Sequence, residues 1–198
     1  GENSVCFEGA ILRAHLPASV AISGGGAIGV EFASVWNAYG VDVTIFYMFP
    51  RLLPTEDEAV AKEIEKAYQK RGIKIMTGTK VKSVKATKTG TKVVVEGKDG
   101  EQTLEPERTL VAIGFRPNTA NLGLEDVGVK LTERGHIDID EKMATNVKGI
   151  WAIGDVTGKL LLAHVAQAMG VVAAENIAGV ETVTLNYDMM PRATYCFP

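Results

Sequence analysis

The sequence predicts a three-layer α/β fold with a parallel sheet, in which one crossover between strands is an antiparallel three-stranded sheet. Three observations carry this prediction. Residues 20–46 pass from a strand pattern to a helical pattern and back, and residues 55–76 repeat a helix followed by a strand. Residues 79–104 then contain three short strand patterns separated by turns. Strands that alternate with helices form a parallel sheet, whereas short strands joined by turns form an antiparallel one.

The first strand–helix–strand unit begins with a short apolar run, residues 20–22, that stops at three consecutive glycines. From Ala27 onward, apolar side chains recur at helical spacing. Gly40 stands where a helix C-terminus commonly places a left-handed residue, and residues 41–46 read as a second buried strand. The apolar face predicted for this helix contains Ile28, Phe32, Val35, Trp36 and Tyr39.

Gly24, Gly26 and Gly29 fit the pattern G-x-G-x-x-G directly after a strand and at the start of a helix. In that context the first glycine allows a tight turn, the second lets the backbone approach a pyrophosphate, and the third lets helix and strand pack closely. The helix N-terminus adds free N–H groups that favour an anion. The unit is therefore predicted to be a Rossmann-like dinucleotide-binding site.

One position departs from this pattern. An Asp or Glu is expected at the end of the second strand, where it holds the adenosine ribose hydroxyls. Tyr47 occupies that position, and a phenol cannot act as a two-acceptor carboxylate. The nearest arginine, Arg51, lies four residues further on. We therefore expect an intact phosphate half, an altered ribose half and weakened NAD binding rather than a switch to NADP.

The next helix is predicted to start with a capping box formed by Thr55 and Glu58 and to end before Gly72. Its core-facing residues are expected to be Val60, Ile64, Ala67 and Tyr68. Residues 73–76 follow as the third parallel strand, and residues 110–113 return as a buried strand after the antiparallel crossover. The crossover carries a row of lysines, which we interpret as a solvated strand face rather than a nucleic-acid site: Lys80, Lys82, Lys85, Lys88 and Lys92.

Beyond Gly114 the pattern becomes rich in loops. Residues 136–140 alternate like a half-buried strand, and residues 150–153 read as a buried strand. A helix is predicted over residues 162–178, with Val165, Met169, Val172, Ala173 and Ile177 facing the core. Residues 192–195 are strand-like.

Composition excludes several functional classes. With 198 residues, 46% hydrophobic content and a net charge of −3, the chain is an ordinary globular protein without a case for nucleic-acid binding. We expect a cytoplasmic protein without a membrane contact, because neither a bilayer-length apolar run nor a signal peptide is present. Two distant cysteines, Cys6 and Cys196, and three scattered histidines form no metal-site spacing.

Several longer motifs resemble the pyridine nucleotide-disulfide oxidoreductases, most closely the actinobacterial dihydrolipoamide dehydrogenases. These motifs are GGGAIGVEFA, RGIKIMTGTKV, VAIGFRPN, TNVKGIWAIGD and PRATYC, and the resemblance extends over the whole chain. The resemblance implies NAD and FAD as cofactors. It implies transfer of electrons from dihydrolipoamide through a disulfide and FAD to NAD. Its further implications are a homodimeric parent enzyme and a 2-oxo acid dehydrogenase complex as partner.

The resemblance also implies positions for the cofactors. Tyr47 occupies the adenosine-ribose position, and Val81 and Gly114 match residues that line the NAD cleft. Asp155 matches the carboxylate that binds the flavin ribityl chain, and the following helix start matches the segment under the flavin ring: Leu161, Leu162, Ala163 and His164. The residues that would lie along NAD are Gly24, Gly25, Gly26, Ala27, Ile28, Gly29, Val30 and Glu31.

Four segments follow from the resemblance: residues 1–17 as a connector from the FAD domain, 18–139 as the NAD-binding domain, 140–179 as part of the FAD domain and 180–198 as the start of a dimerisation domain. The redox C-x-x-x-x-C motif and the acid–base His of the family have no counterpart in this sequence. We therefore expect this chain alone to be inactive towards lipoamide and assign it no catalytic residue. The alternatives are another flavoprotein disulfide reductase, an NADH oxidase or a non-catalytic nucleotide-binding module.

Overall fold

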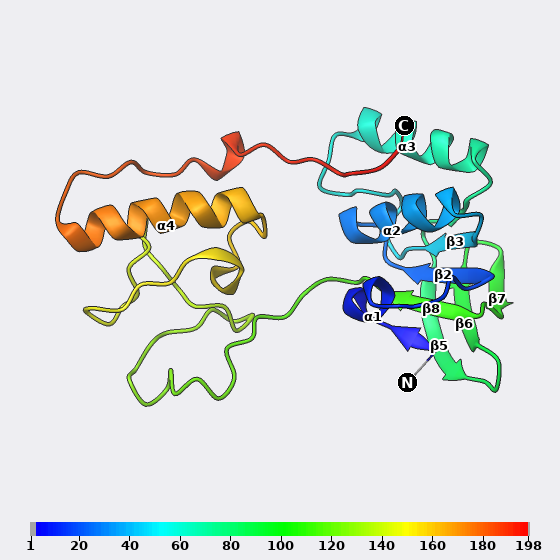
Figure 1. Ribbon diagram of the computed structural model, residues 1–198, viewed down its shortest axis with the longest axis horizontal. Coiled ribbons are helices and arrows are strands. Elements are labelled where there is room, and N and C mark those ends of the chain that lie inside the picture. Colours follow the sequence, from blue (N-terminus) through cyan, green and yellow to red (C-terminus); the bar gives the residue numbers. More distant parts are fainter. Residues whose placement is uncertain (1–2, 198) are drawn as a thin grey trace. The chain divides into compact units, whose positions relative to one another are not determined.

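A computed structural model describes residues 3–197, and these form two compact units (Figure 1). The first unit contains residues 3–114 together with 193–197, and the second contains residues 115–192. The division between the compact units therefore falls at Gly114, earlier in the chain than residue 139, where the sequence places the end of an NAD-binding domain. The assignment of segments to cofactor domains stays a prediction.

A five-stranded parallel sheet forms the middle of the first unit. The chain passes from β2 to its neighbour β3 and on to β4 beyond it, and later crosses to β8 on the other side of β2. The strand order therefore reverses at β2, and the carboxyl ends of β3, β2 and β8 lie at one edge. From one edge strand to the other the strands are β1 (Ser4–Val5), β8 (Arg108–Val111), β2 (Ser19–Ser23), β3 (Asp42–Phe46) and β4 (Lys74–Met76).

The two faces of β2 pack against different layers because alternate side chains of a strand point in opposite directions. Val20 and Ile22 belong to the core shared with the helices α2 (Ala27–Ala38) and α3 (Glu58–Lys70). Ala21 packs on the other face, in a separate cluster with Val93 and Val95. The parallel sheet is thus the central layer of three.

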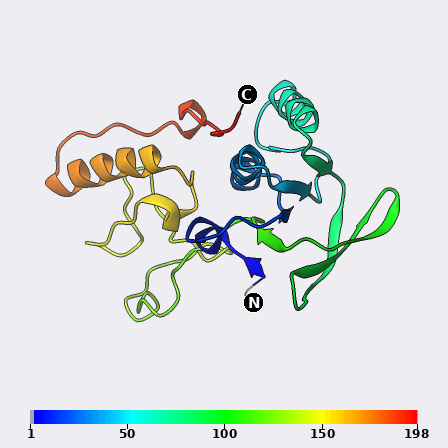
Figure 2. The same cartoon turned by 45° about the vertical axis from the view of Figure 1, so that its right-hand side comes forward.

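The third layer is the antiparallel sheet of β5 (Lys80–Ala86), β6 (Thr91–Gly97) and β7 (Gly100–Leu104), which stands beside the parallel sheet in Figure 2. Its inner face is formed by Val93 and Val95, both fully buried. A 2.6 Å hydrogen bond between the hydroxyls of Thr91 and Thr109 ties β6 to β8 in the interior. The predicted three-layer α/β fold with an antiparallel crossover is confirmed.

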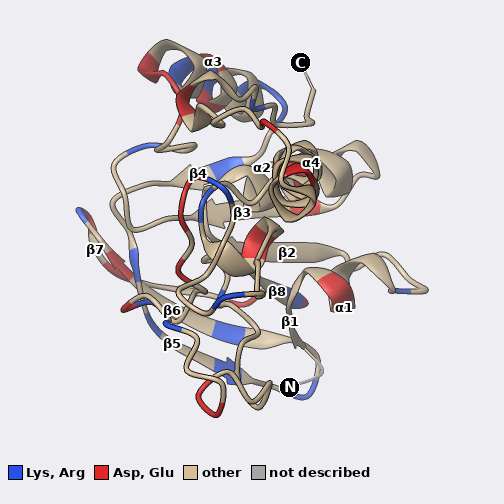
Figure 3. Ribbon diagram, turned by 90° about the vertical axis from the view of Figure 1, so that its left-hand side faces the viewer, with Lys and Arg blue, Asp and Glu red and all other residues tan. Residues whose placement is uncertain are grey.

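Acidic and basic residues occur on the same elements in parts of the first unit, for example on α3 (Figure 3). Lys82 lies 3.3 Å from Glu96 and 3.6 Å from Glu101 on the antiparallel sheet, and Lys62 pairs with Glu58 on α3. These pairs are exposed, so each contributes little to stability. The predicted solvated lysine face agrees with the exposure of these side chains.

The second unit is built around α4 (Ala163–Ala178), which begins one residue later than predicted and ends at Gly179 in a left-handed conformation. Val165, Met169 and Val172 are buried against Met143 and its neighbours. Two short 3-10 helices, η1 (Gly154–Thr157) and η2 (Tyr187–Met189), complete the regular elements described here.

Two strand predictions in the second unit are wrong. Within residues 136–140 only Ile137 forms a bridge, to Leu131, and within residues 150–153 only Trp151 does, to Ala144. The alternating burial of Ile137 and Ile139 follows the predicted pattern. A strand also needs a neighbour along its length, and the described residues provide no such ladder for either segment. Residues 192–195 likewise form no strand.

Several local predictions in the first unit also need correction. The strand predicted at residues 110–113 is β8, which begins at Arg108 and ends at Val111, and Ile113 is 75% exposed. Asp57, not Thr55, caps α3, because its carboxylate accepts a 2.7 Å hydrogen bond from the backbone N–H of Ala59. Of the residues predicted to face the core, Tyr68 is buried and Ile64 packs against the core, whereas Val60 is exposed and Ala61 is buried instead. β1 and the short helix α1 (Phe7–Ile11) lie in a segment for which the sequence predicted no element.

Candidate nucleotide-binding site

The glycine turn lies at the carboxyl end of β2, where the strand order reverses. Gly24 has φ +128°, and a Cβ there would lie 2.1 Å from the carbonyl oxygen of Ala112. A Cβ on Gly29 would lie 2.0 Å from the carbonyl oxygen of Gly24. Both distances exclude a side chain, so these two glycines make the tight turn and the close packing of α2 that the sequence predicts.

Gly26 differs from these two glycines. Its backbone has φ −79° and ψ −176°, an extended conformation open to any residue, and a Cβ there would meet no atom within 4 Å. Gly26 is also the N-cap of α2, without a side-chain hydrogen bond at the cap. The first amides of α2, from Ala27 and Ile28, therefore face an open approach. In open α/β sheets, ligands bind at the carboxyl ends of the strands, at the point where the strand order reverses.

Tyr47 follows β3 and lies beside the turn. Its backbone N–H donates to Met76 over 2.9 Å, and its carbonyl accepts from Thr79 over 2.8 Å. Its ring packs edge-on against Phe49, and a Cβ on Gly25 would lie 2.6 Å from Tyr47 Cδ1. Burial raises the pKa of Tyr47 further above its ordinary value, and the phenol is neutral at physiological pH with or without this shift. The side of the turn on which the sequence predicts the ribose is therefore aromatic and uncharged.

The loop after β3 closes over the turn. The backbone N–H of Leu53 donates a 2.7 Å hydrogen bond to the carbonyl of Gly25. The N–H of Leu52 donates to the carboxylate of Glu65 on α3, also over 2.7 Å. Sequence reasoning missed both contacts, because a backbone donor leaves no signature in a residue pattern.

Other residues predicted to lie along NAD have different surroundings. Val30 is fully buried, and its carbonyl accepts from the hydroxyl of Tyr68. The carboxylate of Glu31 accepts a 2.8 Å hydrogen bond from the backbone N–H of Tyr195. Gly114, at φ +120°, follows β8 at the same edge as the turn, whereas Val81 lies on β5 and is 40% exposed. The parallel sheet thus brings Gly114 and Tyr47 to strand ends on opposite sides of β2.

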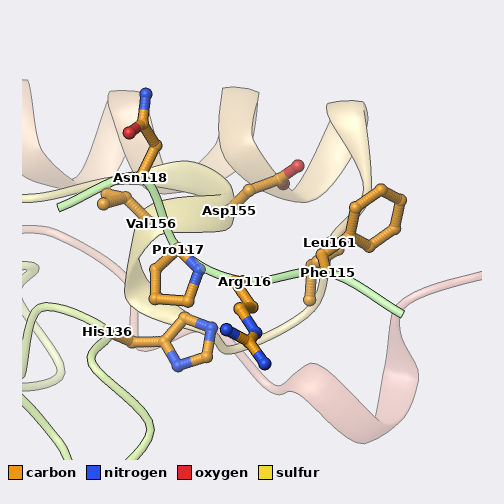
Figure 4. Close-up of a pocket in the computed structure, with 8 residues that line it drawn as sticks. All are labelled: Phe115, Arg116, Pro117, Asn118, His136, Asp155, Val156 and Leu161. Atoms are coloured by element: carbon orange, nitrogen blue, oxygen red, sulfur yellow. The ribbon is translucent and has the colours of Figure 1, made fainter. Parts of the chain in front are cut away.

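The second unit contains a separate cavity of about 260 Å³ (Figure 4). Asp155, on η1, lines it with an exposed carboxylate, and Leu161 lines it just before α4. Arg116 and His136 also line this cavity, and the sequence analysis assigned them no role. The motif VAIGFRPN, which contains Arg116, was the sequence feature that could have indicated a role for this residue. The complete lining is Phe115, Arg116, Pro117, Asn118, His136, Asp155, Val156 and Leu161.

The start of α4 has backbone amides without a side-chain cap. Leu162 is the N-cap without a side-chain hydrogen bond, and Ala163 is the first helical residue. Nε2 of His164 donates to the carbonyl of Pro191 over 2.9 Å, so this ring is already engaged within the second unit. The uncapped amides of α4 are the groups available to a ligand here.

Residues 3–197 contain no group of three or more His, Cys, Asp or Glu side chains that could hold a metal ion. Among the helices of the described chain, none is long and apolar enough to cross a bilayer.

Residues 7–170 match the family described as pyridine nucleotide-disulphide oxidoreductase. The chain is 56% identical over 199 residues to a dihydrolipoyl dehydrogenase of Mycobacterium leprae, and the alignment covers 99% of this chain and 42% of that protein. It is 53% identical over 200 residues to the dihydrolipoyl dehydrogenase of Corynebacterium glutamicum, which covers 100% of this chain and 43% of that protein.

Two solved structures share the fold. The crystal structure of LpdA from Mycobacterium tuberculosis matches with a TM-score of 0.90 and 30% identity, over 97% of this chain and 41% of that one. The HOCl-induced flavoprotein disulfide reductase RclA from Escherichia coli matches with a TM-score of 0.83 and 30% identity, over 92% and 41% respectively. The chain thus spans about two fifths of the length of the relatives it matches.

Proposed function

Because the chain belongs to the pyridine nucleotide-disulphide oxidoreductase family, we propose that its first unit binds NAD(H) at the glycine turn and that the whole protein is a dihydrolipoyl dehydrogenase. The observation that carries the NAD proposal is Gly26. The fold itself requires no glycine there, because its backbone is extended and a Cβ would meet nothing. A glycine at this position is explained if the diphosphate of a ligand approaches the protein backbone closely.

The dinucleotide would place its diphosphate on the first amides of α2, beside Gly26. Tyr47 would contact the adenosine side, and Gly114 would lie on the other side of the turn. Glu31, one turn into α2, is the carboxylate that the family resemblance assigns to the nicotinamide end. Val30 would contribute only its backbone, since its side chain is buried in the core.

The proposed affinity for NAD is weak because Tyr47 replaces a carboxylate. A hydrogen bond to a charged group contributes roughly 1.5 to 3 kcal/mol, which corresponds to about one to two orders of magnitude in affinity. A switch to NADP finds no support at Arg51, because one amino group of its guanidinium donates to the carbonyl of Pro54. Stacking of adenosine on the Tyr47 ring would recover part of the loss.

The second unit would contribute to an FAD site. Asp155 fits a polyol chain, because its exposed carboxylate lines a cavity and can accept hydroxyl hydrogen bonds. The uncapped start of α4, with Leu161 to His164, would lie under the flavin ring. FAD bound there would supply two-electron redox chemistry between a dithiol and NAD. In this chain Asp155 and the α4 amides would bind and orient, and no residue is assigned a covalent role.

For the whole protein we propose dihydrolipoamide as reductant, a 2-oxo acid dehydrogenase complex as partner and a homodimer as assembly. The relatives that are 53–56% identical carry the name dihydrolipoyl dehydrogenase, whereas RclA is 30% identical. This difference favours dihydrolipoyl dehydrogenase over another flavoprotein disulfide reductase.

A fluorescence titration of NADH against the chain and its Gly26→Ala variant tests the NAD proposal. We expect unchanged thermal stability for the variant, since a methyl group fits there, and weaker NADH binding by about tenfold or more. Equal NADH affinity of the two proteins would mean that no ligand approaches this backbone, and would refute the proposed site.

A further inference from the structure

The orientation of one peptide group in the glycine turn depends on the loop after β3. The carbonyl of Gly25 accepts a 2.7 Å hydrogen bond from the N–H of Leu53. A peptide unit is planar and trans, so its C=O and N–H point in opposite directions. The bond from Leu53 therefore fixes the direction of the Gly26 N–H, which points away from the loop.

Leu53 is held in an uncommon conformation to make this bond. Its φ is +45°, a left-handed value that leucine rarely adopts because its Cβ then lies too close to the carbonyl oxygen. Its carbonyl accepts from the N–H of Glu56 over 2.9 Å, and its side chain is 2% exposed. Such a conformation persists only where the surroundings determine it.

Glu65 supplies the contact that joins this loop to α3. Its Oε1 accepts a 2.7 Å hydrogen bond from the N–H of Leu52, whose side chain is fully buried in the first unit's core. A carboxylate that accepts from an amide makes one of the stronger hydrogen bonds in proteins. The contact fixes the residue directly before Leu53, and so fixes the position of the Leu53 N–H.

We propose that Glu65 is a positioning residue for dinucleotide binding, which acts through Leu52 and Leu53 to aim the Gly26 N–H at the diphosphate. The inference rests on the proposed NAD site and adds a residue of α3 that no glycine pattern includes. Glu65 would act through the acceptor oxygen that it offers to the Leu52 N–H, which holds the loop in place.

The test compares Glu65→Ala, Glu65→Gln and a matched control, Glu63→Ala, which removes an exposed glutamate from the same helix. NADH affinity is measured by calorimetry well below the unfolding midpoint of each variant. We expect Glu65→Ala to weaken NADH binding about tenfold. Glu65→Gln keeps an acceptor oxygen and should stay within about threefold of the unmodified chain, and Glu63→Ala should not differ from it.

The amide resonance of Gly26 provides a readout that does not require NADH. In ¹H–¹⁵N spectra without nucleotide, Glu65→Ala should shift the Gly26 peak, whereas Glu63→Ala should leave it in place. An unmoved Gly26 peak, or NADH affinity in Glu65→Ala equal to that of the unmodified chain, would overturn the inference. If the unmodified chain binds no NADH while the Gly26 peak shifts, the proposed function fails and the positioning of the turn stands.

Discussion

The hydroxyl of Tyr68 on α3 donates a 2.7 Å hydrogen bond to the carbonyl of Val30 on α2. Both residues are fully buried, and the bond joins the two helices that cover one face of the parallel sheet. Val30 stands four residues after Gly26, so this bond anchors the helix whose start forms the candidate site.

The ionisation of Tyr68 makes stability depend on pH on the alkaline side. Burial, followed by the nearby Cys196, raises the pKa of the Tyr68 phenol well above its usual value. The folded state therefore retains a proton that the unfolded state releases above about pH 10, and stability falls as pH rises beyond that value. Burial also raises the pKa of Tyr47 and Tyr187, which contribute with the same sign.

Tyr68→Phe should lower the free energy of unfolding by about 1 kcal/mol at neutral pH, because it removes the buried hydrogen bond that the phenol donates to the carbonyl of Val30. The same variant should lose less stability than the unmodified chain between about pH 9 and about pH 11. Urea unfolding at neutral pH measures the first effect, and urea unfolding at about pH 9 and about pH 11 measures the second. Tyr39→Phe is the control, since Tyr39 is 69% exposed. A decline as steep in Tyr68→Phe as in the unmodified chain would contradict the assignment.

Glycine replacements separate folding from binding. Gly24→Ala should destabilise the first unit by roughly 2 to 6 kcal/mol, the sum of backbone strain and overpacking against Ala112. Gly40 has φ +82°, but a Cβ there would meet no atom within 4 Å, so Gly40→Ala should lower the free energy of unfolding by only about 1 kcal/mol. Thermal unfolding followed by circular dichroism gives the order. Equal losses would show that the contact with Ala112 is not rigid.

Arg71 should hold residues 195–197 against α2. Its guanidinium donates to the hydroxyl and the carbonyl of Ser34 and to the carbonyl of Phe197, and it lies 5.7 Å from the ring centroids of Tyr68 and Phe197. Arg71→Met should therefore release this segment and speed the alkylation of Cys196 several-fold.

The alkylation experiment contains its own reference. Cys6 is exposed and should react at the same rate in all variants. Lys70→Met removes an exposed cation from the same helix end and should leave both rates unchanged. A Cys196 rate that does not respond to Arg71→Met would show that other contacts hold the segment.

The elements with a local signal were predicted well. The turn at Gly24 and the buried strand at residues 20–22 follow from sterics and apolar patterning that each short segment carries in its own residues. The strands predicted around Ile137 and Trp151 failed because a strand is completed by a neighbour, and no residue pattern names that neighbour.

The supporting contacts of the candidate site could not be predicted for a related reason. The bonds from Leu53 to Gly25 and from Leu52 to Glu65 start at backbone amides, which every residue except proline possesses. The predicted capping box does not form because the carboxylate of Asp57, directly before the helix, accepts the hydrogen bond from the backbone N–H of Ala59. Such choices are made by geometry in three dimensions.

The most direct measurement of the central claim is a calorimetric titration of this chain with NADH, and separately with NADPH, repeated on Tyr47→Glu. NADH should bind the unmodified chain weakly, and the glutamate should tighten it by about tenfold or more, because a carboxylate can accept from both ribose hydroxyls. NADPH should gain nothing from the substitution. If neither nucleotide binds to the unmodified chain or to Tyr47→Glu, the claim that the first unit is a working NAD site is contradicted.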